Sequence, residues 1–347
     1  MQEALSYDDV LLVPQASSIN SRSQIDIGNE LNSENPVSEE ISLAIPVISS
    51  PMDTITEDDM AFTMSACGGM GIIHRYNSLE EQVHLVAKAK FQNETAPIGA
   101  AVGMTGNFLE RALACKAAGA SVICVDVAHG HHAMMKQCLA TLRLRLGKQT
   151  HIMAGNVATL EAFDCLASWG ADSIRVGIGG GSICSTRLVT GHGIPTLQSV
   201  LDCAKSEHDV KIIADGGLKT SGDIVKAIAA GADFVMLGSM LAGTSETPGE
   251  VMTDKSGDSY KVYRGMASRS AQDSWRKKSS SPEGISTTVP FKGSVVKVLA
   301  DIAGGIKSGF SYSGATNLPE FQARATFIRQ TAAGQAESNT HILSRNK

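Results

Sequence analysis

Short apolar runs alternate along the chain with longer amphipathic stretches. The apolar runs are rich in β-branched residues and are bounded by Gly, Asp, Asn or Ser, as buried parallel strands are. They lie at residues 45–49, 71–74, 98–102, 121–127, 151–154, 173–178, 211–214 and 234–237. Between them, apolar residues recur every three or four positions, which predicts helices. Examples lie at residues 57–66, 79–89, 107–118, 160–169 and 221–230.

The regular repeat of one strand and one helix predicts an α/β fold, and eight such units predict a (β/α)₈ barrel, or TIM barrel. The alternative is an open doubly wound sheet, which more often carries a Gly-x-Gly-x-x-Gly turn after its first strand. The first strand here ends in Ser-Ser-Pro-Met-Asp at residues 49–53. We therefore expect one barrel domain over residues 1–347, with functional residues at the C-terminal ends of its strands.

After the eighth predicted strand the pattern changes. Residues 244–290, the flap, are polar, rich in Gly, Ser and Pro, and weakly periodic. Such a segment is either a solvated excursion or a mobile cover over an active site. A helical pattern returns at residues 293–309, and a tail is expected from about Gln335.

Composition narrows the class of protein. Of the 347 residues, 43% are hydrophobic and 19% charged, which excludes a disordered chain and a coiled coil. No apolar run approaches the roughly 18 residues of a membrane helix, and we expect no secretory signal or membrane association. The net charge of −5, without long blocks of one sign, argues against nucleic acid as a partner.

The seven cysteines are dispersed and odd in number, so they do not indicate a disulfide framework. None has zinc-site spacing. We therefore expect a cytoplasmic protein in which most cysteines are small buried side chains.

Two predicted loops are suited to phosphate. Barrels often bind phosphate with the loops after strands seven and eight, which here begin Asp215-Gly216-Gly217 and Gly238-Ser239. Glycines let backbone N–H groups approach phosphate oxygens. These two turns indicate a phosphorylated ligand.

The loop after the sixth strand carries the strongest local signal. It reads Gly-Ile-Gly-Gly-Gly-Ser-Ile-Cys-Ser-Thr-Arg over residues 177–187. A structural cysteine more often lies in an apolar run, as Cys124 does. Cys184, in a Gly/Ser loop beside Arg187, is better placed as a thiolate nucleophile.

At this loop the sequence resembles the IMP dehydrogenase and GMP reductase family. The similarity extends through LSYDDVLLVP (5–14), SSPMDTITE (49–57), GGMGIIHR (68–75), DVAHGH (126–131), AGNVAT (154–159), ADGG (214–217), residues 231–250, YRGMAS (263–268) and EG (283–284). The resemblance implies a barrel enzyme, usually a homotetramer, that binds a purine nucleoside monophosphate. Its cysteine attacks purine C2, and a nicotinamide cofactor exchanges hydride there.

The resemblance also implies roles for matching residues. Cys184, Thr186 and Glu283 would be catalytic. Nucleotide contacts would come from Ser182, Asp215, Gly216, Gly217, Gly238, Ser239, Gly265, Met266 and Ala267. Cofactor contacts would come from Ser21, Arg22, Arg75, Asp126, Val127, Ala128, Ile178 and Gly179, and from Ser308 and Gly309 of a neighbouring subunit. A monovalent cation such as K⁺ would lie near Gly179, Gly181, Cys184 and Arg187.

The family has two branches. The dehydrogenase oxidises IMP to XMP with NAD, and the reductase converts GMP to IMP and ammonia with NADPH. Four features resemble the reductase: no regulatory domain inserted after the second strand, no Arg-Tyr pair between Met266 and Glu283, NSRSQIDI (20–27), and Asp126-Val127-Ala128. The segments SSPMDTITE and GGMGIIHR and the tail Glu337-Ser338-Asn339-Thr340-His341 resemble the dehydrogenase.

We predict the reductase, because the flap lacks the Arg-Tyr pair that helps a dehydrogenase to activate water, and this hydrolysis step separates the two reactions. A dehydrogenase without the regulatory domain is the alternative. The intact Cys184, Thr186 and Glu283 argue against a catalytically silent nucleotide-binding regulator. Another alternative is a different cysteine-dependent barrel enzyme, such as an amidase or an aldolase. A barrel aldolase would carry a lysine at a strand end, and none of the eight predicted strand ends has one.

Overall fold

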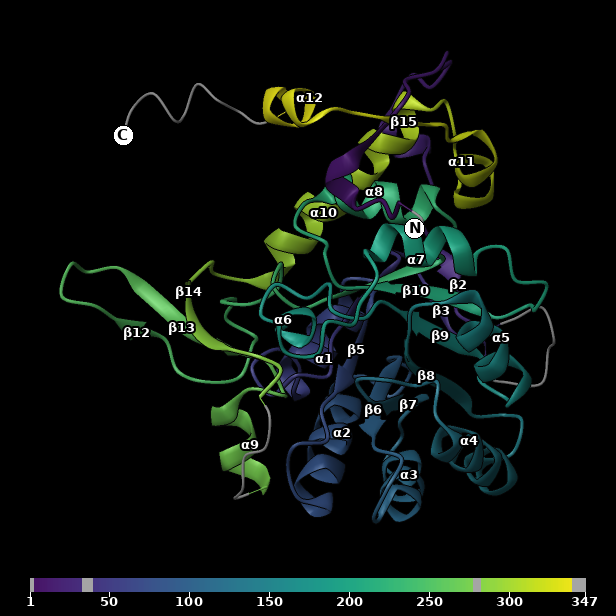
Figure 1. Cartoon of the computed structure of the whole chain (residues 1–347). Coiled ribbons are helices and arrows are strands. Elements are labelled where there is room, and N and C mark those ends of the chain that lie inside the picture. The colour runs from purple at the N-terminus through teal and green to yellow at the C-terminus, as the bar shows by residue number, and fades with distance from the viewer. Residues whose placement is uncertain (1–2, 33–39, 277–281, 339–347) are drawn as a thin grey trace.

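The computed structural model describes residues 3–32, 40–276 and 282–338, and at its centre eight parallel strands form a closed barrel (Figure 1). The strands are β4 (Val47–Ser49), β5 (Met70–Ile73), β6 (Ile98–Val102), β7 (Val122–Asp126), β8 (His151–Val157), β9 (Ser173–Val176), β10 (Lys211–Asp215) and β11 (Phe234–Leu237). Each pairs with the next along the chain, and β11 pairs with β4 to close the barrel. The predicted (β/α)₈ barrel and its eight strands are confirmed.

Helices lie outside the strands (Figure 1). The predicted ones are α1 (Asp58–Ala66), α2 (Leu79–Gln92), α3 (Phe108–Ala117), α5 (Leu160–Ser168) and α8 (Ser221–Ala229). Further helices of the barrel are α4 (Ala133–Leu146), the short α6 (Thr186–Thr190) and α7 (Thr196–Cys203). Side-chain caps at Ser78, Thr159 and Thr220 accept backbone N–H groups at three helix starts, so these starts are encoded locally. No helix within the described residues is long and apolar enough to cross a membrane.

The strands place their side chains in two apolar clusters. One cluster fills the barrel and includes Ile48, Ile72, Met153 and Phe234. A larger one lies between strands and helices. The hairpin of β2 (Asn29–Glu30) and β3 (Ser42–Leu43) adds the buried Leu43 to the interior cluster, and Asn29 bonds to Asp233 just before β11. The hairpin therefore packs over the N-terminal end of the barrel strands, and their C-terminal end is left to form a ligand site.

Elements near the chain ends pack on the outside of the barrel. They are η1 (Tyr7–Asp9), β1 (Val10–Leu12), η2 (Arg22–Gln24), α10 (Val295–Tyr312), α11 (Leu318–Arg324), β15 (Phe327–Arg329) and α12 (Ala332–Glu337). Strand β1 pairs antiparallel with β15, which joins the two ends of the chain. Helix α10 confirms the helical pattern at 293–309. The predicted tail starts inside α12, and its residues 339–347 lie outside the described part.

The described part of residues 244–290 is not the structureless loop that its composition indicated. It contains a sheet of β12 (Met252–Thr253), β13 (Ser259–Arg264) and β14 (Ser286–Pro290), together with α9 (Arg269–Arg276), and it projects from one side of the barrel (Figure 1). The inward positions of β13 include a buried lysine, Lys261, whose ammonium group donates to the Thr244 and Thr247 carbonyls. A charged residue at a buried position hides the apolar alternation of a strand.

One buried histidine makes the fold sensitive to acid. Burial lowers the pKa of His151 to about 4, and its Nε2 lies 2.8 Å from Ser173 Oγ. In the unfolded chain His151 binds a proton near pH 6.5. Neutral, buried His151 therefore contributes fully to the unfolding free energy above pH 6.5, and this contribution is lost as the pH falls towards 4. We expect a loss of about 3 kcal/mol of unfolding free energy over that window.

Urea unfolding at several pH values measures this effect. We expect His151→Asn to flatten the dependence between pH 6.5 and 4, whereas His208→Gln, at an exposed histidine, retains it. Equal slopes in wild type and His151→Asn would contradict the assignment.

Candidate active site

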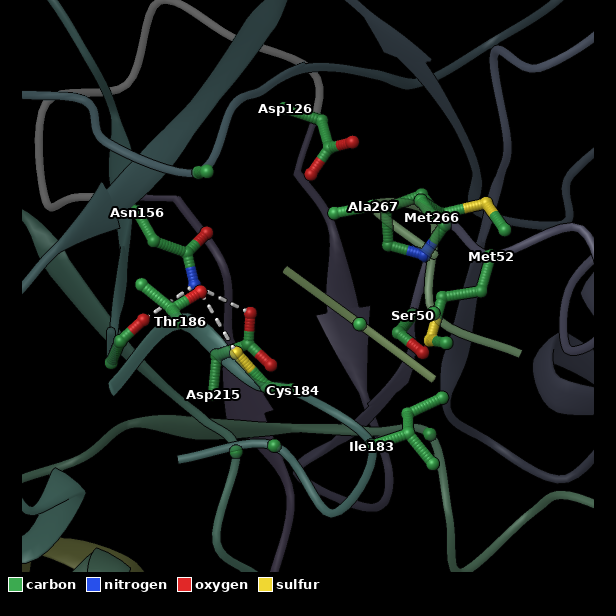
Figure 2. A pocket seen from close by; sticks show the side chains of 18 of the residues that line it. Ser50, Met52, Asp126, Asn156, Ile183, Cys184, Thr186, Asp215, Met266 and Ala267 are labelled. Carbon is green, nitrogen blue, oxygen red and sulfur yellow. Dashed lines mark hydrogen bonds between the residues drawn. The ribbon is translucent and has the colours of Figure 1, made fainter. Parts of the chain in front are cut away.

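A cavity of about 830 Å³ opens at the C-terminal ends of the barrel strands. In the view of Figure 2, Cys184, Thr186, Asn156 and Asp215 lie on its left and Ser50, Met52 and Met266 on its right. Most of the residues singled out in the sequence line it. They are Arg75, Asp126, Val127, Ala128, Ile178, Gly179, Gly181, Ser182, Cys184, Thr186, Asp215, Gly216, Gly217, Gly238, Ser239, Gly265, Met266, Ala267 and Glu283.

The three predicted catalytic residues form a hydrogen-bonded chain. The Cys184 thiol donates to Thr186 Oγ1 at 3.1 Å, and the Thr186 hydroxyl donates to Glu283 Oε2 at 2.9 Å. Backbone pairing holds the flap here, because Ser185 N–H donates to the Glu283 carbonyl at 2.8 Å. A thiol is therefore connected through a hydroxyl to a carboxylate.

Cys184 differs from most other cysteines in its exposure. Burial raises the pKa of Cys115 to about 11 and the pKa values of Cys124, Cys138 and Cys203 to about 12. These four remain thiols at neutral pH, and the thiolate is the reactive form.

We expect iodoacetamide at pH 8 to alkylate Cys184 at least about tenfold faster than the four buried cysteines. The folded chain is labelled, quenched and digested, and peptide mass spectrometry then measures alkylation at each cysteine in one sample. Faster labelling of Cys124 than of Cys184 would contradict the burial assigned to both.

A buried arginine that the sequence analysis did not single out organises the site. Arg175, on β9 and 6% exposed, donates to Asp126 Oδ1 at 2.5 Å and to Asp215 Oδ2 at 2.8 Å. Burial alone would lower the pKa of Arg175, but Asp215 and Asp126 outweigh it and hold the pKa above its usual value. The sequence did offer a signal for Arg175, because a charged residue inside an apolar strand must find a partner when it is buried.

Asp215 is oriented through one of its two oxygens. Asn156 Nδ2 donates to Asp215 Oδ2 at 2.8 Å, and Arg175 uses the same oxygen. Among the described residues, every hydrogen bond to this carboxylate goes to Oδ2. Oδ1 therefore keeps its lone pairs for a ligand.

Both predicted phosphate turns line the cavity. Gly216 and Gly217 have φ values of +93° and +79°, which favour glycine. Around Gly238, the position that a Cβ would occupy lies 3.0 Å from Ser50 Oγ and 3.2 Å from the Tyr263 hydroxyl. Neither Ser50 nor Tyr263 was predicted. Each is a hydroxyl donor beside a turn.

The base of the flap is anchored to the barrel by ion pairing. Arg264 donates to both oxygens of Asp53, and its backbone N–H donates to Thr54 Oγ1 at 3.2 Å. Further along, Trp275 of α9 packs edge-on against Tyr76, with ring centroids 5.0 Å apart. The Arg75 guanidinium lies 5.0 Å from the Tyr76 ring. The flap therefore forms one wall of the cavity on its Asp126 side.

Some predicted ligand-binding residues do not line this cavity. Ser21 and Arg22 lie at η2, while Ser308 and Gly309 lie in α10, where Gly309 packs against Val225 of α8. Their cofactor roles stay predictions. For a cation, the Arg187 guanidinium donates to the Ile194 carbonyl and has no lone pair to offer. The Arg187 side chain therefore does not fit a K⁺ ligand. The described residues contain no acidic, His or Cys cluster suited to a metal.

The fold and site define a class: a (β/α)₈-barrel enzyme in which an exposed cysteine meets a hydroxyl–carboxylate pair. A family model described as "IMP dehydrogenase / GMP reductase domain" matches residues 4–341. The chain belongs to this family. Its members are oxidoreductases of purine metabolism that use nicotinamide cofactors.

Relatives carry the names of both branches. The inosine-5'-monophosphate dehydrogenase of Nitrosopumilus maritimus is 34% identical, with 98% of each chain covered. The GMP reductase of Leishmania major is 33% identical, with 99% of this chain and 98% of the relative covered. A solved structure of GMP reductase from Trypanosoma brucei, in complex with guanosine 5'-monophosphate, has a TM-score of 0.90 and 31% identity, covering 98% of each chain.

The lengths of the alignments with these two relatives remove one argument for the reductase, which is the missing inserted domain. They span 478 positions with the dehydrogenase and 489 with the reductase, against 347 residues in this chain. Both relatives therefore contain more than a hundred residues that this chain lacks. The absence of an inserted domain does not separate reductase from dehydrogenase here.

Proposed function

We propose that this enzyme is a GMP reductase, which converts GMP to IMP and ammonia with NADPH in purine nucleotide salvage. The observation that carries the proposal is the hydrogen-bonded chain from Cys184 through Thr186 to Glu283. A reductase must protonate a leaving amino group, and a carboxyl group connected to the nucleophile can supply that proton. The flap also lacks the Arg-Tyr pair that the dehydrogenase uses with water.

The residues of the chain divide the work as follows. Thr186 and Glu283 take the proton from the Cys184 thiol, and the thiolate bonds to C2 of GMP. The same pair returns the proton to the 2-amino group, which leaves as ammonia. The nicotinamide cofactor supplies hydride to C2 when it is bound. The bond between Sγ and C2 then breaks, which gives IMP, and the released thiolate takes a proton from solvent to restore the thiol.

Binding residues follow from the same geometry. Asp215 Oδ1 accepts from the ribose hydroxyls, while Arg175 and Asn156 hold Oδ2. The turns at Gly217 and Gly238 enclose the phosphate. Asp126, Val127, Ala128, Ile178 and Gly179 border the side of the cavity expected to hold nicotinamide. The proposal includes a single-domain cytoplasmic homotetramer, with Ser308 and Gly309 of a neighbouring subunit at the cofactor.

Absorbance at the nicotinamide band tests the proposal. One reaction holds enzyme, GMP and NADPH, and the other holds enzyme, IMP, NAD and K⁺. We expect loss of NADPH absorbance that requires GMP and releases ammonia. NADH formation from IMP would overturn the reductase and favour the dehydrogenase, to which SSPMDTITE and GGMGIIHR are closer.

The carboxylate provides a more specific prediction. We expect Glu283→Gln to lower kcat for GMP about a hundredfold or more, because the amide cannot exchange the proton. KM should change little. Glu250→Gln, at an exposed glutamate elsewhere in the flap, is the matched control. A Glu283→Gln enzyme with wild-type kcat would remove Glu283 from the mechanism.

A further inference from the structure

A second cavity, of about 220 Å³, adjoins the main one. Gly180, Ser182, Gly217, Leu218 and Ser239 line both cavities. The other walls of the second cavity come from residues 6–8, the start of α7, Lys219 and Arg187. The two cavities therefore meet at the glycine turns expected to hold phosphate.

Two residues in the wall of the second cavity carry buried hydroxyl groups. Tyr7 and Thr196 are each 3% exposed, and neither hydroxyl oxygen has a hydrogen-bond partner within the described residues. A buried polar group without a partner destabilises the folded chain, so native proteins rarely leave one. Two such groups beside one small cavity leave two donors for a ligand that enters it.

Both side chains border the glycine turns. Thr196 Oγ1 lies 2.5 Å from the position that a Cβ on Gly180 would occupy and 3.6 Å from that on Gly217. The Tyr7 ring carbon Cε2 lies 3.5 Å from the Gly217 position. Only glycine at 180 leaves room for the Thr196 hydroxyl. The Thr196 hydroxyl and the Tyr7 ring therefore pack beside Gly180 and Gly217, which also line the main cavity.

The charges of the second cavity favour an anion. Lys219 and Arg187 both line it, with Lys219 paired to Asp8 at 2.7 Å. Burial raises the pKa of Tyr7, and Asp223 and Asp215 raise it further, so the phenol stays protonated and can donate. Asp8 also lines the cavity and pairs with Lys219, so the lining keeps one net positive charge, from Arg187. Two O–H donors and this charge suit a group with several acceptor oxygens.

We propose that Tyr7 and Thr196 complete the phosphate site: the phosphoryl group of the nucleotide lies where the cavities meet, and the two hydroxyls donate to its oxygens. This inference rests on the proposed nucleotide substrate. It assigns a function to the N-terminal segment LSYDDVLLVP, which the chemistry of the main cavity does not use.

Calorimetric titration with IMP and with inosine tests the inference, because the two ligands differ only in the phosphate. We expect Tyr7→Phe and Thr196→Val each to weaken IMP binding about tenfold and to change inosine binding by less than about twofold. Thr196→Ser keeps the hydroxyl and should bind IMP like wild type. Tyr312→Phe and Thr95→Val, at exposed positions, are the matched controls.

Each outcome has a defined meaning. Unchanged IMP affinity in both variants would overturn the proposal, and so would equal weakening of IMP and inosine. If Tyr7→Phe fails to fold, the comparison of Thr196→Val with Thr196→Ser decides alone. IMP is the product of the reductase and the substrate of the dehydrogenase, so wild-type IMP oxidation overturns the reductase assignment only. A wild-type chain that binds no IMP overturns both.

Discussion

Replacing Cys184 with alanine is expected to lower the rate of NADPH oxidation with GMP at least about ten-thousandfold. The variant lacks the only atom in the catalytic chain that can bond to purine C2, while Thr186 and Glu283 keep their mutual hydrogen bond at 2.9 Å. Because Asp215 and the phosphate turns are untouched, GMP binding should remain within about threefold of wild type. Stopped-flow absorbance measures the rate, and calorimetry measures the affinity.

Cys165→Ala is the matched control, because Cys165 is a half-buried thiol in α5 and outside the cavity. It should retain wild-type turnover. A Cys184→Ala enzyme that keeps one per cent or more of wild-type activity would show that no covalent bond to Sγ is needed. Cys184→Ser would not rescue the rate, because an alcohol is a far weaker acid than a thiol.

Replacing Arg175 with methionine is expected to lower the unfolding free energy by about 3–5 kcal/mol. The variant leaves Asp126 and Asp215 without the guanidinium that lies within 2.5 Å and 2.8 Å of them. Two half-buried carboxylates then lack their shared counter-ion, and Asp215 Oδ2 keeps only the hydrogen bond from Asn156. KM for GMP should therefore rise, since Oδ1 no longer points reliably at the ribose.

Urea unfolding and steady-state kinetics check this prediction in the same preparation. Lys205→Met breaks the exposed pair with Asp202, whose N–O distance is 2.7 Å, and should cost less than about 1 kcal/mol. Arg175→Lys keeps the charge but cannot reach both carboxylates with a planar fork, so it should fall between wild type and Arg175→Met. Equal stabilities of Arg175→Met and Lys205→Met would contradict the role assigned to Arg175.

The barrel was predictable because each strand is buried on both faces and each helix has one apolar side. Parallel strands such as β6 and β11 are therefore continuous apolar runs, and helix starts such as Thr220 carry their own caps. The candidate residues were predictable because barrel enzymes place chemistry after the strands. Cys184 and Asp215 both follow this rule.

The flap was less predictable. Lys261 is buried because the Thr244 and Thr247 carbonyls accept its ammonium protons, and these partners lie 17 and 14 residues away. The local pattern of apolar and polar residues around Lys261 contains no information on partners so far along the chain. The sheet of the flap therefore looked like a polar loop.

Local sequence specifies the barrel, the glycine turns and the Gly/Ser loop that carries Cys184, because each depends on neighbours along the chain. Tertiary packing sets which distant groups meet. It set Glu283 beside Thr186 across 97 residues, bridged Asp126 and Asp215 through Arg175, and placed Tyr7 with Thr196 in the wall of the second cavity. These contacts arise from closure of the barrel and docking of the flap and N-terminal segment, and no local pattern specifies them.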